Sequence, residues 1–490
     1  MKHNTLAEKL ITGEAVARHH PYPRFVLTPE MWVDVAHDLG ESLDMLGLWA
    51  DGEQVHMALF EPSSDMFAVA SVTVKNNQYP AISQFHLPAM RFERTIQDLW
   101  NFEAKGLPDG RPWLKHDDDN PYQFLPVEGE GLHEIPVGPV HAGIIEPGHF
   151  RFTAFGETVV RLEERLGYAH KGVEKLLEGR DIDGAAKLCA RISGDSTVAY
   201  STGFARAVEA ALEVDIPERA QWLRALMAEL ERLANHFGDI GAICNDAAFA
   251  LMHAHTAILR EDVLQAADKC FGHRLMMDRV IPGGVSSDLS PAGVDLLRRL
   301  LAALNGRFNQ LAKGYDNNVS IKNRTSGAGI LTADLARHYA AGGVIGRASA
   351  RCFDARKLFP CPPYDRLEFS VPTVKAGDVN ARIWIRIQDV WQSLSLIEQI
   401  LNKIPAGDIH SDLPQPSDGE CEGMSMVEGF RGDILTWVKL AKDGTIIRCH
   451  PRDPSWFQWP LLEAVIEKNI VADFPLCNKS FNCSYSGHDL

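Results

Sequence analysis

The residues of this chain that could do chemistry are serines, carboxylates and arginines rather than a familiar set of metal ligands. The stretch "RISGDS" (Arg191–Ser196) places Ser193 and Ser196 three positions apart, which is the spacing of a cysteine pair that holds a metal. A serine hydroxyl stays protonated at neutral pH and is a poor ligand for a soft transition metal, whereas a thiolate donates charge to it. Nine cysteines are present but no two form a C-x-x-C pair, so we expect free thiols and no standard zinc or iron–sulfur ligand set.

The composition bounds the class of protein. The chain has 490 residues, of which 45% are hydrophobic, enough for a sizeable core and two or three domains. Its net charge of -16 argues against nucleic acid as a partner. No run approaches the ~20 apolar residues of a membrane span, and the first residues lack the apolar region of a signal peptide. We therefore expect a cytoplasmic protein that reaches a membrane only through partner subunits.

Residues 1–115 are predicted to form a small α/β domain. A helix is expected over Thr28–Gly40, with a threonine N-cap and a proline in its first turn. A second helix is expected over Arg91–Phe102. Alternating apolar and polar residues predict three strands between them, at Gln54–Phe60, Met66–Val74 and Ala81–Leu87. The following segment is rich in Pro, Gly and Asp, so residues 116–137 are predicted to be a linker.

Residues 138–490 are predicted to be mainly helical with β-hairpins, which gives an α+β fold overall. A hairpin is expected near residues 148–168, turning at Gly156, and a long amphipathic helix over Ile216–Cys244. A loop is expected over Ser411–Met424, and a second hairpin turns at Asp443-Gly444. The remaining helices are expected near Glu261–Phe271, Ser290–Gly306, Thr332–Gly342 and Asp378–Lys403.

Several segments, in order, carry a resemblance that covers nearly the whole chain. They are Gly138–Glu157, Arg165–Asp181, Asp278–Val285, Tyr364–Asp389, Glu428–Asp433 and Asn469–Pro475. They resemble the large subunit of membrane-bound (group 4) nickel–iron hydrogenases of the formate hydrogenlyase type, and the related 49-kDa subunit of respiratory complex I. The front of the chain, with "ERTIQDLWNFEAKGLPDGRPWL", resembles the complex I 30-kDa subunit. The ending "NKSFNCSYSGHDL" is similar to a hydrogenase-related subclass that lacks the metal-binding cysteines.

The resemblance implies four positions for nickel–iron ligands, and none of them is a cysteine here. In the family one C-x-x-C pair lies in an "R-x-C-G-x-C" element, where this chain has Ser193 and Ser196. The other pair lies near the C-terminus, where alignment on "DFP" places Ser484 and Gly487. The expectation is that this chain binds no metal and no other cofactor of its own. The alternative is a nickel–iron hydrogenase with unusual ligands, drawn from Cys477, Cys483 and His488.

Charged residues that the family uses around its metals are retained. By resemblance, Glu146 matches a glutamate that relays protons, Glu174 a second carboxylate on a proton path, and Arg431 an arginine that overhangs the metals. Arg191 and Asp195 add a cation and an anion beside the degenerate site. These residues are candidates for pocket and proton-transfer roles. The alternative for each is an ordinary salt bridge or a helix cap.

A quinone is one acceptor that the complex I resemblance allows. It makes His141, in "GPVHAG", a candidate for the histidine that meets a quinone headgroup, with His149 and Arg191 as further candidates for binding the substrate. The tyrosine that the family places near the first cysteine pair has no counterpart, because Tyr168 and Tyr200 are out of register.

The resemblance implies a subunit of a proton-translocating oxidoreductase complex of the NADH:quinone oxidoreductase or hydrogenase type. Its partners would be an iron–sulfur subunit that carries the clusters, a membrane arm with antiporter-like subunits, and a formate dehydrogenase. The chain would lie on the inner face of the cell membrane and couple electron transfer to an acceptor or to ion translocation. The alternative is a non-catalytic scaffold of the same complex.

Overall fold

The structure is a computed structural model that describes residues 5–116, 121–143, 145–359, 361–416 and 419–490. Its N-terminal part is built on a sheet with the strand order β1-β3-β6-β5-β4. The β3–β6 pair is parallel and the other pairs are antiparallel. The strands are β1 (Glu14–Ala15), β3 (Arg24–Leu27), β4 (Asp44–Ala50), β5 (Gln54–Glu61) and β6 (Met66–Thr73). The strands predicted at Gln54–Phe60 and Met66–Val74 are confirmed.

Three helices accompany this sheet: α1 (Leu6–Leu10), α2 (Pro29–Ala36) and α3 (Met90–Trp100). The Thr28 hydroxyl caps α2 by accepting from the Met31 amide at 3.3 Å, and Pro29 occupies the first turn, where it costs no hydrogen bond. Helix α3 ends at Asn101, whose left-handed conformation terminates the helix. Both helix predictions in this domain are therefore confirmed in kind, with shifted ends.

The strand predicted over Ala81–Leu87 is wrong. These residues form a turn that leads into the 3-10 helix η1 (Leu87–Ala89), between β7 (Gln78–Pro80) and α3. Glu93, fully buried on α3, accepts hydrogen bonds from the Ile82 amide at 2.6 Å, the Ser83 amide at 3.2 Å and the Ser83 hydroxyl. The carboxylate therefore takes up the amides that a neighbouring strand would need. Strand β7 pairs instead with β8 (Glu103–Lys105).

A three-stranded antiparallel sheet follows, with the order β11-β10-β9. Strands β10 (His149–Phe155) and β11 (Thr158–Arg165) form the predicted hairpin, and Gly156 at the turn has a φ of 59°, which favours glycine. Strand β9 (Leu132–Val137) pairs with β10 and lies within the range that the sequence assigns to the linker. Its exposed histidine and glutamate hide the strand signal, because only Ile135 and Val137 pack against the hydrophobic core.

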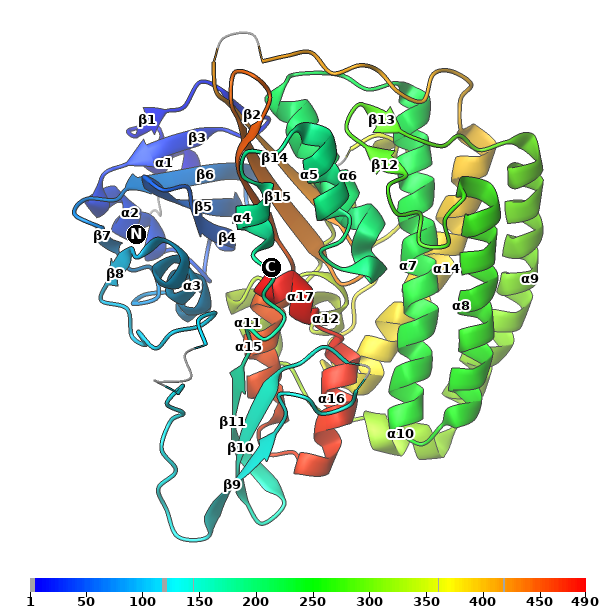
Figure 1. Cartoon of the computed structure of the whole chain (residues 1–490). Coiled ribbons are helices and arrows are strands. Elements are labelled where there is room, and N and C mark those ends of the chain that lie inside the picture. Colours follow the sequence, from blue (N-terminus) through cyan, green and yellow to red (C-terminus); the bar gives the residue numbers. More distant parts are fainter. Residues whose placement is uncertain (1–4, 117–120, 144, 360, 417–418) are drawn as a thin grey trace.

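Long helices form a bundle on one side of the molecule, at the right of Figure 1. They are α7 (Glu218–Asp246), α8 (Ala250–Phe271), α9 (Pro291–Asp316) and α14 (Val379–Lys403). Helix α7 packs against both α8 and α14, and it buries apolar side chains at helical spacing, among them Leu223, Leu230, Phe237 and Ile240. Helices α8 and α9 are longer than predicted. No helix of the described residues is long and apolar enough to cross a bilayer.

A second sheet lies between the N-terminal part and the bundle (Figure 1), with the order β16-β15-β14-β2. It consists of β2 (His19–His20), β14 (Cys421–Glu428), β15 (Asp433–Leu440) and β16 (Ile446–Arg452). The β15–β16 turn is the predicted hairpin, whereas β14 begins inside the predicted loop Ser411–Met424. Strand β2 pairs in parallel with β14, and Arg24 forms a buried ion pair with Glu422 at 2.9 Å. The two parts of the chain thus share one sheet.

Shorter elements complete the fold and carry most of the candidate residues. Helix α6 (Thr197–Ala211) packs on β14 and β15. The others are α4 (Val173–Leu177), α5 (Ile182–Cys189), α10 (Val319–Thr325), α11 (Ala333–His338), α12 (Gly343–Ala348), α13 (Ala355–Leu358), α15 (Ser455–Ile466), α16 (Phe474–Phe481), α17 (Tyr485–Asp489), β12 (Val280–Ile281) and β13 (Gly284–Val285). Together with the two larger sheets they confirm the predicted α+β class.

Candidate functional site

A cavity of about 550 Å³ brings together candidate residues from distant parts of the sequence. It lies between the loop that joins β9 to β10, the start of α6, the connection between β14 and β15, and helices α16 and α17. We call it the ligand-position cavity, because two of the four implied nickel–iron ligand positions line it. Of the residues singled out from the sequence, the cavity is lined by His141, Glu146, Ser193, Asp195, Arg431, Cys483 and Ser484.

An ion pair between Asp195 and Arg431 crosses one wall of this cavity. Arg431 Nη1 donates to Asp195 Oδ1 at 3.0 Å and Nη2 donates to Oδ2 at 2.6 Å, the two-point geometry that a guanidinium and a carboxylate favour. Burial would raise the pKa of Asp195, but the charge and hydrogen bonds of Arg431 outweigh it and lower the pKa to about 2. Asp195 is therefore a carboxylate at neutral pH, and the site holds a paired charge.

The backbone on both sides of this pair is held by further hydrogen bonds. Arg431 Nε donates to the Asn482 carbonyl at 2.6 Å, and the Arg431 carbonyl accepts from Gln458 at 3.0 Å. The Asp195 carbonyl accepts from Asn235 on α7 at 2.7 Å. The carboxylate of Glu231, also on α7, accepts from two amides in the first turn of α6. Helix α7 thus fixes the segment that presents Asp195.

The serine side chains at the implied ligand positions form hydrogen bonds within the protein. Ser193 donates to Asp195 Oδ1 at 2.5 Å, and the Ser196 hydroxyl lies 3.2 Å from Arg431 Nη1. Ser484 caps α17 by accepting from the Gly487 amide at 2.9 Å. Hydroxyls hydrogen-bonded in this way, beside a guanidinium cation, do not fit a nickel–iron centre that needs four thiolates.

Gly487 offers no ligand atom, and its surroundings leave no room for one. A Cβ at this position would lie 2.7 Å from the Tyr200 hydroxyl and 2.7 Å from Asp453 Oδ2. These two groups are themselves joined by a hydrogen bond of 2.6 Å in the buried interior. A cysteine at this implied ligand position would therefore have to displace both side chains.

The alternative ligands Cys477, Cys483 and His488 do not converge. Cys477 is buried against Gly329 and Arg382, whereas His488 stacks on Trp456 at 4.2 Å between ring centroids. Burial raises the pKa of the Cys477 thiol to about 11, so it is protonated at neutral pH. Within the described residues, no three His, Cys, Asp or Glu side chains are grouped so as to hold a metal ion.

Glu146 and His141 reach the cavity from the loop between β9 and β10. Glu146 is exposed, and its Oε2 accepts from the Ser486 amide at 3.0 Å, which connects this loop to α17. Burial lowers the pKa of His141, so its imidazole is neutral at pH 7. Its Nε2 atom is buried and has no hydrogen-bond partner among the described residues. The pair supplies a carboxylate and a neutral imidazole to the same space.

Sequence reasoning missed a further part of the cavity wall, which is polar as well. It carries Asp246, at the end of α7, and Lys479 and Asn482, at the end of α16. Lys479 donates to Asn482 Oδ1 at 2.9 Å, and burial raises the pKa of Asp246. The only sequence signal for this wall was the polar "NKSFN" run itself, which also fits an ordinary amphipathic helix.

Glu174 lies in a separate buried cluster. It accepts from Arg448 at 2.6 Å and contacts His450 Nδ1 at 2.5 Å, both on β16. Burial would raise the pKa of Glu174, but these two partners lower it to about 2. The cluster borders a different cavity, of about 240 Å³, between Trp100 and Trp456.

Arg191 and His149 also lie apart from the ligand-position cavity. Arg191 forms a two-point ion pair with Asp278 at 2.7 Å on the protein surface. His149 begins β10 and its ring lies 5.1 Å from that of Phe124, while its Nδ1 contacts the Gly138 carbonyl at 3.3 Å. Most of the candidate residues thus line the ligand-position cavity, whereas Glu174, Arg191 and His149 each lie at a separate site.

The ligand-position cavity can bind a polar group and exchange protons with it. Its walls present a fixed carboxylate–guanidinium pair, an exposed carboxylate, a neutral histidine, an ammonium group and a carboxyl of raised pKa. Groups of this kind, gathered at one cavity, are what acid–base chemistry needs.

Comparison of the sequence with known proteins identifies the family of this chain. The sequence profile described as "Respiratory-chain NADH dehydrogenase, 49 Kd subunit" matches residues 239–418, and that of "Nickel-dependent hydrogenase" matches residues 171–238. The chain is 28% identical to formate hydrogenlyase subunit 5 of Escherichia coli, over 85% of this chain and 78% of that protein. It is 32% identical to an NADH-quinone oxidoreductase subunit of Dehalococcoides mccartyi strain 195, over 64% of this chain and 85% of that protein. It is 26% identical to an NADH-quinone oxidoreductase subunit of Bacteroides fragilis, over 81% of this chain and 82% of that protein. The chain therefore belongs to the family of complex I 49-kDa subunits and nickel–iron hydrogenase large subunits.

Proposed function

We propose that this chain is a metal-free large subunit of a membrane-associated, complex I-related oxidoreductase. In this proposal electrons arrive from an iron–sulfur subunit, and the ligand-position cavity serves an acceptor that takes up protons, or the coupling of electron transfer to ion translocation. The observation that carries the proposal is the Asp195–Arg431 ion pair, which joins the first ligand motif to the arginine that would overhang the metals. The hydroxyls of Ser193 and Ser196 are hydrogen-bonded to this pair and supply no thiolate for nickel or iron.

A quinone is the acceptor that the cavity's polar groups favour. Its headgroup carbonyls accept hydrogen bonds and, on two-electron reduction, take up two protons. His141 and Lys479 can donate hydrogen bonds, and Glu146 can pass protons from water, because it is exposed at the cavity and in reach of solvent. The partners in this proposal are the iron–sulfur subunit, a membrane arm with antiporter-like subunits and a formate dehydrogenase, on the inner face of the cell membrane.

The metal content of the assembled complex tests the first part of the proposal. The complex is purified from its native host through a tag on this chain, and nickel is measured by mass spectrometry against the amount of this chain. We expect iron, which the clusters of partner subunits supply, and no stoichiometric nickel. One nickel for each chain would overturn the proposal and favour a hydrogenase with unusual ligands. The copurifying subunits are identified in the same preparation.

Turnover of the assembled complex separates a working cavity from a scaffold. Reduced methyl viologen serves as the electron donor and decylubiquinone as the acceptor. We expect Glu146→Gln and Asp195→Asn to lower turnover by at least about 100-fold, the lower end of the range for a positioned proton-transfer group. The matched control is Glu53→Gln, an exposed glutamate in the N-terminal sheet. Normal assembly with normal turnover in both cavity variants would identify the chain as a scaffold.

A further inference from the structure

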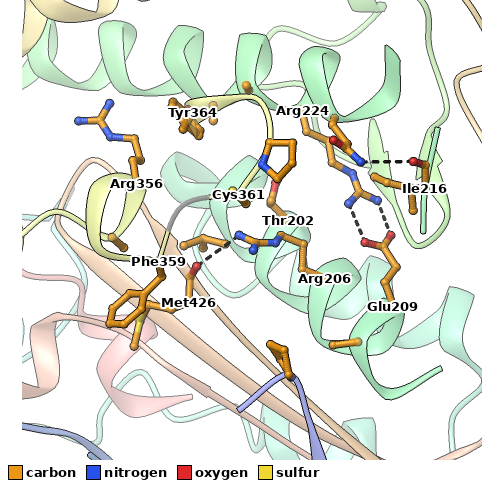
Figure 2. Close-up of a pocket in the computed structure, with 18 of the residues that line it drawn as sticks. Thr202, Arg206, Glu209, Ile216, Arg224, Arg356, Phe359, Cys361, Tyr364 and Met426 are labelled. Carbon is orange, nitrogen blue, oxygen red and sulfur yellow. Dashed lines mark hydrogen bonds and ion pairs between the residues drawn. The ribbon is translucent and has the colours of Figure 1, made fainter. Parts of the chain in front are cut away.

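A second cavity, of about 450 Å³, is lined by residues of α6 and shares no lining residue with the ligand-position cavity (Figure 2). It is enclosed by α6, by α7, by the segment that contains α13 and Tyr364, and by the end of β14. We propose that this cavity is a binding site for a small organic carboxylate with an apolar body. The proposal does not depend on the function assigned to the ligand-position cavity. It rests on the cavity's walls, on one unpaired cation and on two unpartnered polar atoms.

The walls suit an apolar body. Alanines of α6 and α7 line the cavity beside larger apolar side chains, namely Ile216, Phe359 and Met426. A volume of this size falls within the range of roughly 300–1,000 Å³ that is typical of small-molecule sites. An apolar body is favoured there because it removes this surface from water.

Most of the charged groups that line the cavity are already paired. Glu209 binds Arg224 at two points, 2.6 and 2.9 Å, and also accepts from the Gly283 amide (Figure 2). Arg356 binds both oxygens of Asp354, at 2.7 and 3.0 Å, and donates to Glu229 at 2.8 Å. These groups are neutralised within the protein and need no ligand.

Among the cations of the described lining, Arg206 is the exception. It projects from α6 into the middle of the cavity in Figure 2, and its guanidinium makes a single long hydrogen bond, of 3.4 Å, to the Met426 carbonyl. It forms no ion pair with any residue that the structure describes, although its side chain is half-buried. A guanidinium withdrawn from water in this way gains most from an anion that binds two of its donors, as a carboxylate does.

Two further polar atoms of the lining lack partners. The Thr202 hydroxyl, one turn before Arg206 on α6, and Glu428 Oε1 are both buried without a hydrogen bond among the described residues. Glu428 is 7% exposed, and its other oxygen accepts from the Ala355 amide at 2.8 Å. Burial, together with the nearby charge of Asp354, raises the pKa of Glu428 to about 8, so at neutral pH its carboxyl is mostly protonated and can donate. Arg206, Thr202 and Glu428 thus offer donors to one carboxylate.

The unpaired charges favour a monoanion. With Glu428 protonated, Arg206 is the one cation of the described lining without an ion pair, and one carboxylate can pair with it. Glu213 and Asp215 also line the cavity, but both are exposed, so water screens their charge. A phosphate dianion would need more cations than the described lining leaves unpaired, and an amine would meet Arg206 with like charge.

A charge series on the full chain tests the proposal. Hexanoate, hexan-1-ol and hexylamine share one apolar body and differ in charge, and their binding is measured by isothermal titration calorimetry. We expect hexanoate to bind more tightly than the other two, and Arg206→Gln to weaken hexanoate at least about 10-fold, as expected for a lost charge-assisted hydrogen bond. The matched control is Arg298→Gln, an exposed arginine on α9, which should leave binding unchanged. Equal affinity for hexanol and hexanoate, or no effect of Arg206→Gln, would overturn the proposal.

Alkylation of a cysteine locates the bound hexanoate without any substitution. Cys361 lines this cavity and is partly buried, whereas Cys352 is exposed and does not line it. We expect hexanoate, and not hexan-1-ol, to slow the reaction of Cys361 with iodoacetamide, while the rate at Cys352 stays the same. Hexanoate that leaves both rates unchanged would show that it binds elsewhere or not at all. The alkylation rates test the proposal on the natural chain, so they remain informative even if Arg206→Gln impairs folding.

Discussion

Asp195 and Arg431 lie 236 positions apart in the chain and meet as a two-point ion pair, with nitrogen–oxygen distances of 3.0 and 2.6 Å. The pair ties the segment before α6 to the connection between β14 and β15, so it is both a chemical feature of the cavity and a tether between two elements. Its partners differ in exposure: the Arg431 side chain is 8% exposed, whereas that of Asp195 is 35% exposed. Water therefore screens the pair in part.

We expect Asp195→Ala to lower the free energy of unfolding by ~1–3 kcal/mol, because it leaves a buried guanidinium without its anion. Arg431→Ala should cost much less in the Asp195→Ala background than in the natural chain. Urea unfolding of the two single variants and the double variant measures this coupling. Asp334→Ala serves as the control, since it breaks the exposed Arg337–Asp334 pair and should have an effect near zero. Strictly additive effects at Asp195 and Arg431 would contradict the pairing.

The Glu174 cluster predicts a loss of stability in acid. The pKa of Glu174 falls from 4.5 to about 2 on folding, which corresponds to ~3 kcal/mol of stability when the group is ionised in both states. This contribution is present above pH 4.5 and is lost as the pH falls toward 2. Chemical denaturation of Glu174→Gln should therefore show a deficit at pH 7 that shrinks below pH 4.5. A deficit of constant size across this range would mean that Glu174 is not ionised in the folded protein.

Glu428 predicts the opposite trend. Burial raises its pKa to about 8, so the folded protein favours the protonated carboxyl and loses stability as the pH rises from 4.5 through 8. Glu428→Gln keeps a neutral group and can still accept from the Ala355 amide. We expect the variant to gain stability relative to the natural chain between pH 6 and 9, measured by thermal unfolding over that range. A pH-independent difference between the two proteins would show that Glu428 ionises normally.

Ser484 predicts a small, specific effect of a helix cap. Its hydroxyl accepts from the Gly487 amide at the start of α17. We expect Ser484→Ala to lower the free energy of unfolding by about 1 kcal/mol, and Ser484→Gly to lower it by only a few tenths, because glycine is itself a tolerated N-cap. Urea unfolding of both variants measures the difference. An alanine variant as stable as the glycine variant would show that the cap contributes nothing.

Elements whose signals are local were predictable from the sequence. In β10 the apolar residues Phe150, Phe152 and Ala154 alternate with polar ones, and α7 repeats its apolar side chains at helical spacing. Each of these signals can be recognised from the segment alone. The turn at Ile82 and Ser83 was not predictable, because its cause is a carboxylate on the following helix. A segment of alternating apolar and polar residues forms a strand only when its backbone amides are free to pair with a neighbouring strand.

The candidate site shows the same division. The resemblance singled out Asp195 and Arg431 separately, but their direct contact depends on how β14 and β15 dock on α6, which no local pattern reveals. Arg191 stands four residues before Asp195 and yet faces Asp278 at the surface, because the intervening residues leave α5 and turn into α6. Lys479 and Asp246 escaped notice, since a polar residue at the end of a helix is usually just solvated.

The crowding around Gly487 couples this position to two buried side chains. Tyr200 and Asp453 are joined by a hydrogen bond, and each stands 2.7 Å from where a Cβ on residue 487 would begin. A cysteine introduced at position 487 would therefore displace both side chains, although neither occupies an implied ligand position. Building a four-cysteine site into this chain would thus require changes at these two neighbours as well as at the four positions themselves.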